Sequence, residues 1–282
     1  MNASVNAYFD TLTGKRVAVL GIGVSNRPLI RMLLEYGAEV TACDKTPREK
    51  LDEEVLALER LGARLHVGED YLEGLEADVV FRTPGMRPDL PQIRRLTEGG
   101  AQLTSEMEAF FEVCPCTRIA VTGSDGKTTT TTLVGELFRA TGRTTHVVGN
   151  IGYPITATAG ISKQDDVTVA EVSSYQCEGI SQFHPHVGAV LNITEDHIVR
   201  HGSMEVYIAM KRRIFDRQTA HDVAVFNYDD PTCREMAKGL KAQVAWFSRK
   251  EKVPYGAYVA DNHIILKLGE GEQMVCRCDE VY

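Results

Sequence analysis

The sequence of 282 residues has no run of about 18 apolar residues, and its start lacks a basic segment followed by an apolar run. The first absence argues against a membrane-spanning helix, and the second argues against a secretory signal. We therefore expect a cytoplasmic protein with no membrane partner. The chain also lacks internal repeats at solenoid periods and low-complexity segments, so no repeat architecture is indicated.

Basic residues are in deficit, because 31 Lys and Arg against 39 Asp and Glu give a formal net charge of −8. This balance disfavours a nucleic-acid partner bound through a broad basic face, although it leaves room for a local basic pocket for phosphates. With 43% hydrophobic and 25% charged residues, the composition is that of an ordinary soluble globular protein. The length allows two ordinary domains, each with its own core.

The sequence also lacks a C-x-x-C motif. The seven cysteines are an odd number, and they are scattered except at Cys114/Cys116 and Cys276/Cys278. The C-x-C spacing there is not the C-x-x-C of a zinc knuckle, which disfavours a structural metal site. We therefore expect free, reduced thiols.

The first pattern that is present is a strand, turn, helix and strand over residues 16–44. The strand RVAVLG leads into GIGVSN, which opens an amphipathic stretch with Leu29, Ile30, Leu33 and Leu34, and AEVTACD follows as a second strand. A helical segment at LDEEVLALERL, a strand at ADVVF and a helix from PQIRRL continue the alternation to residue 112. This order predicts an open, mainly parallel sheet.

Near Val113 the pattern restarts, because RIAVTG (118–123) is again a buried strand that feeds a glycine turn and a helix from Lys127. Strands at DVTVAEV and VGAVLNI flank SSYQCEGI, and AVFN follows a helix expected over 203–217. Beyond Pro254, the alternating segments GAYVADNHIILKL and EQMVCRC, with Gly-Glu-Gly between them, predict an antiparallel hairpin. The sequence thus predicts two α/β domains, residues 1–112 and 113–282.

The run V-T-G-S-D-G-K-T-T-T at 121–130 lies between a predicted strand and the start of a predicted helix. Glycine amides and a helix N-terminus favour phosphate oxygens, Lys127 can bridge terminal phosphates, and the Thr128 hydroxyl can reach magnesium. Val121 replaces the first glycine of the standard phosphate loop, so a glycine turn before an ordinary helix is the alternative. The ATP-binding candidates are Gly123, Ser124, Asp125, Gly126, Lys127, Thr128 and Thr129.

The compressed form T-G-x-x-G-K-T resembles the Mur ligase and folyl-polyglutamate ligase superfamily, and further motifs follow in the expected order. E-V-S-S-Y-Q (171–176) resembles the E-x-S-S-[FY]-Q signature of the D-glutamate-adding branch, and N-I-T-E-D-H-I-V-R-H-G-S (192–203) resembles N-I-T-x-D-H-L-D-R-H-G-S. G-N-I-G (149–152) matches the segment that places an asparagine, here Asn150, near the phosphates and substrate. Asp125 and Val199 stand where the family usually carries asparagine and aspartate, so Val199 is assigned no catalytic role.

The resemblance implies a Rossmann-like N-terminal domain followed by a P-loop-type α/β ATP-binding central domain. It further implies ATP-dependent addition of D-glutamate to UDP-N-acetylmuramoyl-L-alanine through an acyl phosphate, in peptidoglycan precursor synthesis. Family members carry a third, C-terminal domain that helps to bind ATP and D-glutamate, and we expect these 282 residues to lack it and to be inactive alone. A two-domain binding protein that does not ligate, or a ligase for another amino acid, is the alternative. We expect a monomer.

Two residues outside the phosphate loop are candidate metal ligands. Glu171 lies near the end of one apolar strand and His197 at the end of another, where ligands collect in α/β sheets. Such oxygen and imidazole ligands could hold a divalent cation, although a lone histidine is more often structural. The resemblance implies two Mg²⁺ sites built from Thr128, Glu171, His197 and Lys211, and catalytic roles for Lys127, His197 and Lys211.

Lys211 shares one predicted helix face with Tyr207 and Ile214. A snorkelling lysine is the ordinary interpretation. The family's matching lysine is carbamylated, which turns a cation into a carboxylate-like oxygen donor for the second magnesium. We expect desolvation and the neighbouring Arg212 and Arg213 to lower the pKa of this lysine and to supply the neutral amine that reacts with carbon dioxide.

The run G-I-G-V-S-N resembles a dinucleotide fingerprint, with Asp44 where an NAD-binding acid could sit. Asn26 replaces the third glycine, which weakens the case for NAD. In the ligase family the matching turn binds the UDP part of the substrate, and T-P-G at 83–85 forms a nearby loop for which ordinary turn formation is the alternative. The resemblance implies substrate contacts by Gly23, Val24, Ser25, Asp44, Lys45, Thr46, Thr83, Pro84, Gly85 and Asn150.

Overall fold

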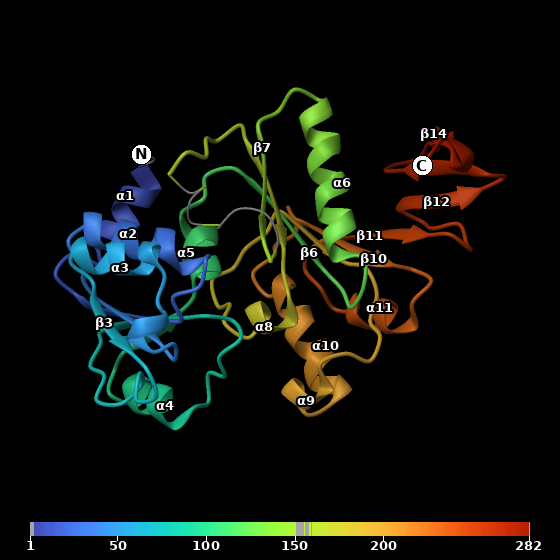
Figure 1. Cartoon of the computed structure of the whole chain (residues 1–282). Helices are drawn as coiled ribbons and strands as arrows, with labels where there is room; N and C mark the ends of the chain where they lie inside the picture. The colour runs from blue at the N-terminus through green and yellow to red at the C-terminus, as the bar shows by residue number, and fades with distance from the viewer. Residues whose placement is uncertain (1–2, 151–154, 156–157, 159, 282) are drawn as a thin grey trace. The chain divides into compact units, whose positions relative to one another are not determined.

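The computed structural model describes residues 3–150, 155, 158 and 160–281 (Figure 1). Contacts between Cα atoms divide the chain into two compact units. The first contains the residues up to Cys116, the described part of 151–166, and Glu178–Phe183. The second contains Thr117–Asn150, Val167–Cys177 and the chain from His184 onward. Both units are α/β, as the sequence predicts.

The first unit is built on a sheet of five described strands in the order β3-β2-β1-β4-β5, in which every neighbouring pair is parallel. The connections from β1 to β2, from β2 to β3 and from β4 to β5 contain helices, whereas the one from β3 to β4 consists of turns. This strand order with helical connections is the pattern of a doubly wound sheet. Its elements are α1 (Ala3–Asp10), β1 (Arg16–Leu20), α2 (Asn26–Glu35), β2 (Glu39–Asp44), η1 (Arg48–Lys50), α3 (Glu53–Arg60), β3 (Arg64–Val67), β4 (Val79–Arg82), α4 (Pro91–Glu98), β5 (Gln102–Thr104) and α5 (Glu106–Val113).

Local sequence explains where α3 begins and which face it buries. The Asp52 carboxylate accepts a hydrogen bond from the Val55 amide, so it caps a helix whose first turn also carries two glutamates. Leu58 is fully buried, whereas Leu61, one turn later, is 55% exposed. The helix therefore contributes one apolar stripe to the core.

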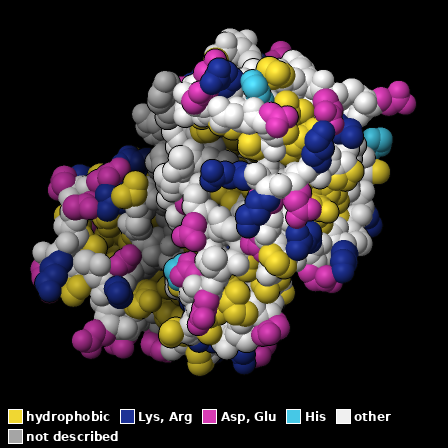
Figure 2. Space-filling model, turned by 90° about the vertical axis from the view of Figure 1, so that its right-hand side faces the viewer, with side chains coloured by type: hydrophobic (Ala, Val, Ile, Leu, Met, Phe, Trp, Pro, Cys, Tyr) yellow, Lys and Arg dark blue, Asp and Glu magenta, His cyan; other side chains and the backbone are white. Residues whose placement is uncertain are grey.

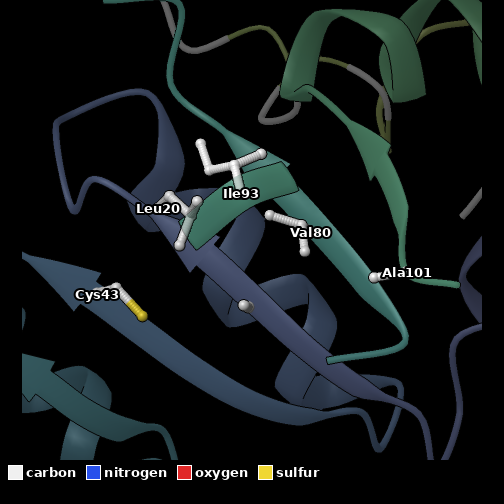
Figure 3. Close-up of a cluster of buried hydrophobic side chains, with 6 residues drawn as sticks. Leu20, Cys43, Val80, Ile93 and Ala101 are labelled. Atoms are coloured by element: carbon white, nitrogen blue, oxygen red, sulfur yellow. The ribbon is translucent and has the colours of Figure 1, made fainter. Parts of the chain in front are cut away.

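A hydrophobic cluster holds α4 against the sheet. Ile93 of α4 packs with Leu20 of β1 and Val80 of β4, and all three side chains are fully buried (Figure 3). Cys43 of β2 and Ala101 complete the labelled part of the cluster. This packing fixes the ends of β1 and β4, which carry the turns described below.

The order of the strands makes the carboxyl ends of β1 and β4 neighbours, at the point where the sheet reverses its winding direction. The turns that follow these strands pack closely together. Gly21 has a φ of +94°, and a Cβ atom there would lie 2.9 Å from the Thr83 Cγ2 atom. Only glycine satisfies both the conformation and the close approach.

Residues Glu178–Phe183 return to the first unit and pack on α5. The Oε1 atom of Glu108, a side chain only 5% exposed, accepts hydrogen bonds from the Ser181 amide at 2.9 Å, the Ser181 hydroxyl at 2.7 Å and the Gln182 amide. The rings of Phe183 and Phe111 stack with their centroids 3.9 Å apart. The first unit therefore takes part of its packing from a segment far along the sequence.

The second unit contains a sheet of nine described strands in the order β14-β13-β12-β11-β10-β9-β6-β8-β7. Strand pairs are parallel from β7 to β12 and antiparallel beyond it. Its elements are β6 (Thr117–Thr122), α6 (Lys127–Ala140), β7 (Thr145–Gly149), β8 (Val167–Glu171), α8 (Ser174–Cys177), β9 (Val187–Val190), α9 (Ile198–His201), α10 (Met204–Arg212), η2 (Arg213–Phe215), β10 (Val223–Asn227), α11 (Pro231–Met236), β11 (Gln243–Ser248), β12 (Gly256–Ala260), β13 (His263–Lys267), β14 (Gln273–Arg277) and η3 (Cys278–Glu280).

The central position of β6 determines what surrounds the phosphate loop. Its neighbours are β8 and β9, so the residues that follow these three parallel strands meet at one edge of the sheet. The helix expected over 203–217 is α10, which ends at Arg212 and continues as a 3-10 turn.

The C-terminal part differs from the single hairpin that the sequence predicts. Asp261 and Asn262 have φ values of 47° and 62°, which is the type I′ geometry that joins two adjacent antiparallel strands. They split GAYVADNHIILKL into β12 and β13, and β13 then pairs with β14. Two successive hairpins therefore replace one, and the Asp-Asn pair is the sequence signal for the first.

The surface carries mixed charge on the face that Figure 2 presents, where acidic, basic and hydrophobic side chains are interspersed. None of the helices in the described ranges combines the length and apolar character that crossing a membrane requires.

The two leucines of α3 and its C-terminal cap give a matched test of the first core. Leu58→Ala should lower the free energy of unfolding by about 2–5 kcal/mol, because it leaves a cavity in a fully buried site. Leu61→Ala should change it by no more than about 0.5 kcal/mol, since that side chain is mostly exposed. Urea unfolding measures both, and equal losses in the two variants would contradict this packing.

Candidate functional site

The phosphate loop joins β6 to α6, and it folds around its own lysine. The Lys127 Nζ atom donates hydrogen bonds to the carbonyl oxygens of Gly123 at 2.9 Å and Ser124 at 2.8 Å. Lys127 is also the first residue of α6, so its ammonium lies beside the amides of a helix N-terminus. The loop thus gathers positive charge and backbone donors where an anion would bind.

The segment after β9 fixes the shape of this loop. The Asn192 Oδ1 atom accepts a hydrogen bond from the Asp125 amide at 2.8 Å, and the Thr194 hydroxyl donates to the Asp125 carboxylate at 3.3 Å. The Ser124 hydroxyl lies 3.0 Å from the Tyr207 hydroxyl of α10 and donates to the Thr194 carbonyl. The Ser124 side chain is therefore directed into the protein, although the sequence had made it an ATP-binding candidate.

Glu171 at the end of β8 is only 1% exposed. Its carboxylate accepts hydrogen bonds from the Thr128 hydroxyl at 2.8 Å and the Asn150 side-chain amide at 3.1 Å. Gly149 allows this approach, because it has a φ of +102° and a Cβ atom there would lie 2.3 Å from the Glu171 carbonyl oxygen. Three residues singled out from the sequence are thus brought together. Ile151 and Gly152 of the same motif lie outside the described residues.

Lys211 of α10 is buried, with 1% of its surface exposed. Its Nζ atom donates to the Gly123 carbonyl at 2.8 Å and the Thr122 hydroxyl at 3.3 Å, and it lies 4.8 Å from the centre of the Tyr207 ring. The snorkelling alternative is therefore wrong. A buried ammonium held by neutral oxygens is destabilised relative to the neutral amine.

The pKa of Lys211 is lowered to about 8, mainly by burial and to a smaller extent by the positive charge of Lys127, while Cys177 and Asp196 oppose the shift. The expected contribution of Arg212 and Arg213 is not among these causes. Arg212 instead donates hydrogen bonds to the carbonyl oxygens of Met236 and Lys238. The neighbouring cation that lowers this pKa is therefore Lys127 of the phosphate loop, and not an arginine next to Lys211 in the sequence.

His197 has a φ of 54° and a half-exposed side chain. Its Nδ1 atom lies 3.3 Å from the Tyr175 hydroxyl, and its Nε2 atom lies 3.3 Å from the Asp196 carboxylate. The Arg200 guanidinium stacks over the Tyr175 ring at 4.9 Å from its centre. Sequence reasoning missed Tyr175 as a neighbour of the histidine, although the aromatic position of the 171–176 motif marks it.

A cavity of about 280 Å³ opens at this edge of the sheet. Glu171 is not among its lining residues, but it accepts a hydrogen bond from the side chain of Asn150, which is. In the part of the chain that the structure describes, no group of three or more His, Cys, Asp and Glu side chains is arranged to hold a metal ion. The oxygen atoms of Glu171 and Thr128 nevertheless suit a hard cation. The cavity is lined by Lys127, Asn150, Ser173, Ser174, Tyr175, Asp196, His197 and Lys211.

The first unit has a separate cavity of about 340 Å³ at the reversal point of its sheet. Asp44 lies on its wall, and this carboxylate accepts hydrogen bonds from the amides of Ile22 and Thr46, both at 2.9 Å. Burial disfavours the charged form, but these hydrogen bonds outweigh it and lower the pKa of Asp44. The cavity is lined by Gly21, Asp44, Lys45, Tyr71, Thr83, Gly85, Met86, Arg87 and Leu90.

Only some of the predicted substrate contacts line this cavity. Gly23, Val24, Ser25, Thr46 and Pro84 are not among its lining residues. Asn150 lines the cavity at the phosphate loop, where its motif had placed it. The structure also explains the residue that breaks the dinucleotide fingerprint. The Asn26 side-chain amide donates to the Gly21 carbonyl at 2.8 Å, so asparagine closes the turn where glycine was expected.

A family model described as the Mur ligase middle domain matches residues 121–279. The UDP-N-acetylmuramoylalanine--D-glutamate ligase of Acetivibrio thermocellus is 40% identical over 282 residues, which are 100% of this chain and 60% of that protein. A protein of the same name from Clostridium botulinum is 42% identical over 268 residues, or 95% of this chain and 58% of its own length. The chain thus spans about 60% of the curated relatives that it matches.

Solved structures give the same fold. A murein peptide ligase from Psychrobacter arcticus matches with a TM-score of 0.57 and 16% identity, over 93% of this chain and 61% of that chain. The UDP-N-acetylmuramate:L-alanyl-gamma-D-glutamyl-meso-diaminopimelate ligase from Neisseria meningitides matches with a TM-score of 0.57 and 17% identity, over 89% of this chain and 84% of that chain. At these identities the likeness concerns the fold alone.

The buried state of Lys211 predicts a dependence of stability on pH. Its pKa is about 8 in the folded chain and 10.5 as an ordinary lysine, so between these values the unfolded state binds more protons. Stability should therefore rise with pH in this window, by up to about 3 kcal/mol relative to Lys211→Met. Urea unfolding in carbonate-free buffer measures the difference, and a difference that stays constant across the window would contradict the burial.

Proposed function

The chain belongs to the Mur ligase family, and on that premise we propose that it is the UDP-substrate-binding and ATP-binding part of a ligase that joins D-glutamate to UDP-N-acetylmuramoyl-L-alanine. Within this proposal, residues 1–112 bind the uridine nucleotide and residues 113–282 bind ATP. The curated relatives that share 40–42% identity carry the name of that activity. The sequence signature at 171–176 is the one typical of the D-glutamate-adding branch.

One observation carries the proposal. Lys127, the Glu171–Thr128 pair and the buried Lys211 converge on a single phosphate loop, and two of the lysine contacts share the Gly123 carbonyl. An ordinary glycine turn before a helix needs none of these groups. Burying a carboxylate and an ammonium beside it costs stability unless a ligand uses them, which favours a site over a structural turn.

The proposed reaction begins when the L-alanine carboxylate of the substrate attacks the γ-phosphate of ATP, which forms an acyl phosphate and releases ADP. The D-glutamate amine then attacks the acyl carbon, a tetrahedral intermediate forms, and phosphate leaves as the amide bond is made. Lys127 and the loop amides neutralise charge on the transferring phosphoryl group, so catalysis is mainly electrostatic and positional. No side-chain nucleophile is needed.

Magnesium bound among these oxygens would polarise the phosphoryl oxygens and balance their charge. Thr128 and Glu171 would hold one ion, and Glu171, His197 and a carbamylated Lys211 would hold the second. Carbamylation joins the neutral lysine nitrogen to the carbon of carbon dioxide and releases a proton. The lowered pKa of Lys211 keeps a usable fraction of that neutral amine near neutral pH.

In the first unit, the cavity at the ends of β1, β2 and β4 would hold the uridine diphosphate. Lys45 and Arg87 on its wall offer positive charge to an anion. The Asp44 carboxylate already accepts two backbone hydrogen bonds, so its role is to order the Gly21 and Thr46 turns. NAD is disfavoured, because Asn26 closes the turn where the third glycine of a dinucleotide site would stand.

Lys127→Ala tests whether the two sites are separate. It should weaken ATP binding to the chain at least about tenfold, because an ammonium at the phosphates is lost, while UDP affinity changes by less than about twofold. Isothermal titration measures both, and NAD should show little binding. In protein of the relatives' length, the same change should abolish the acyl phosphate.

The matched control is Lys241→Ala, which removes an exposed lysine of the same unit and should leave both affinities unchanged. In the longer protein, phosphate release from ATP should require D-glutamate as the amine, and L-alanine or a diamino acid should not replace it. Wild-type turnover in Lys127→Ala would contradict the assignment of the phosphate loop. Turnover with a different amino acid would mean that the protein belongs to another branch of the family.

Lys211→Ala should cost the longer protein most of its activity if the carbamate supplies a metal-binding oxygen. Short carboxylates such as acetate should restore part of the rate by occupying the vacated space, whereas they should not rescue Lys127→Ala. Steady-state rates with and without acetate measure the rescue. A Lys211→Ala enzyme with an unchanged rate and unchanged magnesium dependence across carbon dioxide levels would end the carbamate proposal.

A further inference from the structure

The first unit has a second cavity, of about 670 Å³, at the amino-terminal edge of its sheet. Arg16, Glu39 and Arg64, which are the first residues of β1, β2 and β3, all line it. The cavity proposed for the uridine nucleotide lies at the opposite, carboxyl-terminal edge, where Gly21 and Asp44 line it. The two cavities share no lining residue, so this one is a separate space.

The connection from β3 to β4 explains why this space is open. The connections from β1 to β2, from β2 to β3 and from β4 to β5 carry α2, α3 and α4. Residues 68–78 form turns instead, and Gly74, Leu75 and Glu76 of this connection belong to the cavity wall. A run of turns covers less of a sheet than a helix does, so part of the sheet near β3 stays uncovered.

Strand register puts the polar residues of this cavity on one face of the sheet. Arg64 and His66 are two residues apart on β3, so their side chains leave the strand on the same side. Thr41 is the register partner of Arg64. Glu39, two residues before Thr41 on β2, is the register partner of Arg16. Register partners share a face of a parallel sheet, so all five side chains belong to one surface.

Two opposite charges at this cavity have no partner among the described residues. Arg16 is occupied, because its guanidinium pairs with Glu76 at 2.7 Å and with Asp78 at 2.9 Å. By contrast, neither the Arg64 guanidinium nor the Glu39 carboxylate makes a hydrogen bond or an ion pair within residues 3–150, 155, 158 and 160–281. The cavity therefore offers one positive and one negative group that the protein itself does not use.

We propose that this cavity binds a free α-amino acid, with the ligand's carboxylate on Arg64 and its ammonium on Glu39. The Cα atoms of these two residues are about 8 Å apart, from one strand spacing and two residues of rise, so a small ligand that carries both charges can bridge them. The planar guanidinium suits a carboxylate, and Thr41 and His66 add polar groups beside it. The inference does not depend on the proposed ligase activity.

The mixed charge of the cavity favours a zwitterion over a simple ion. A ligand with only negative charge would be repelled by Glu39 and Glu76, and a ligand with only positive charge would be repelled by Arg64. Only a zwitterion satisfies both unused groups. The cavity is also larger than the two charged groups of an amino acid need, so it leaves room for the ligand's side chain.

Titration of the chain with L-alanine and with L-glutamine tests this site, followed by the NMR signals of the His66 ring, which His66→Gln assigns. Both amino acids should shift these signals saturably, with dissociation constants in roughly the millimolar range that two charged contacts allow. Acetate carries only the carboxylate and ethylamine only the ammonium, so each should bind at least about tenfold more weakly. Saturating UDP should not displace the amino acids, because its proposed cavity lies at the other edge of the sheet.

Charge variants separate recognition from folding. Glu39→Gln and Arg64→Gln should each weaken amino acid binding about tenfold. Both should leave the midpoint of urea unfolding unchanged, since neither side chain has an ion pair to lose within the described residues. The matched control is Arg48→Gln, which removes an exposed arginine of the same unit that pairs with Glu59 and does not line the cavity. It should leave amino acid affinity unchanged.

The results that would overturn the inference are distinct from a failure of the proposed function. The inference is wrong if neither amino acid gives a saturable shift, if acetate or ethylamine binds as tightly as the amino acids, or if affinity survives both Glu39→Gln and Arg64→Gln. Displacement by UDP would also overturn it, because the site would then be the nucleotide's. A chain that binds amino acids as expected but no UDP would support this inference and contradict only the proposed nucleotide site.

Discussion

Two lysine ammonium groups donate to one carbonyl oxygen, that of Gly123, and the geometry of the second unit depends on this convergence. Lys127 reaches it from α6 and Lys211 from α10, so the oxygen connects the phosphate loop to two helices. Burial lowers the pKa of Lys211, and the neighbouring charge of Lys127 lowers it as well. The contact between Lys211 and the Gly123 carbonyl therefore both orients the phosphate loop and holds the Lys211 amine beside it.

Both units obey one rule of parallel sheets, which is that side chains after neighbouring strands collect at the carboxyl edge. In the first unit, the ends of β1, β2 and β4 surround the cavity of Gly21 and Asp44. In the second, the ends of β6, β8 and β9 surround the phosphate loop. Strand order therefore decides which distant residues become neighbours, and the chemistry follows from that order.

The sequence alone predicts the elements whose signals are local, such as β6, the glycine turn and the start of α6 at Lys127. It could not predict that Glu171 holds Thr128, or that Lys127 rather than Arg212 lowers the pKa of Lys211, because those contacts depend on strand order and helix packing. The family resemblance identified Thr128, Glu171 and Lys211 as site residues, but it did not give the contacts between them. The Asp261–Asn262 turn was a local signal that sequence reasoning missed.

The return of Glu178–Phe183 to α5 has a consequence for biosynthesis. A ribosome releases the chain from its N-terminus, so α5 emerges well before the segment that Glu108 and Phe111 bind. The first unit cannot complete its packing when its own strands are finished, and it must wait until Phe183 has left the exit tunnel. The phosphate loop at 121–130 precedes this segment in the sequence, so part of the second unit is synthesised before the first unit can complete its packing.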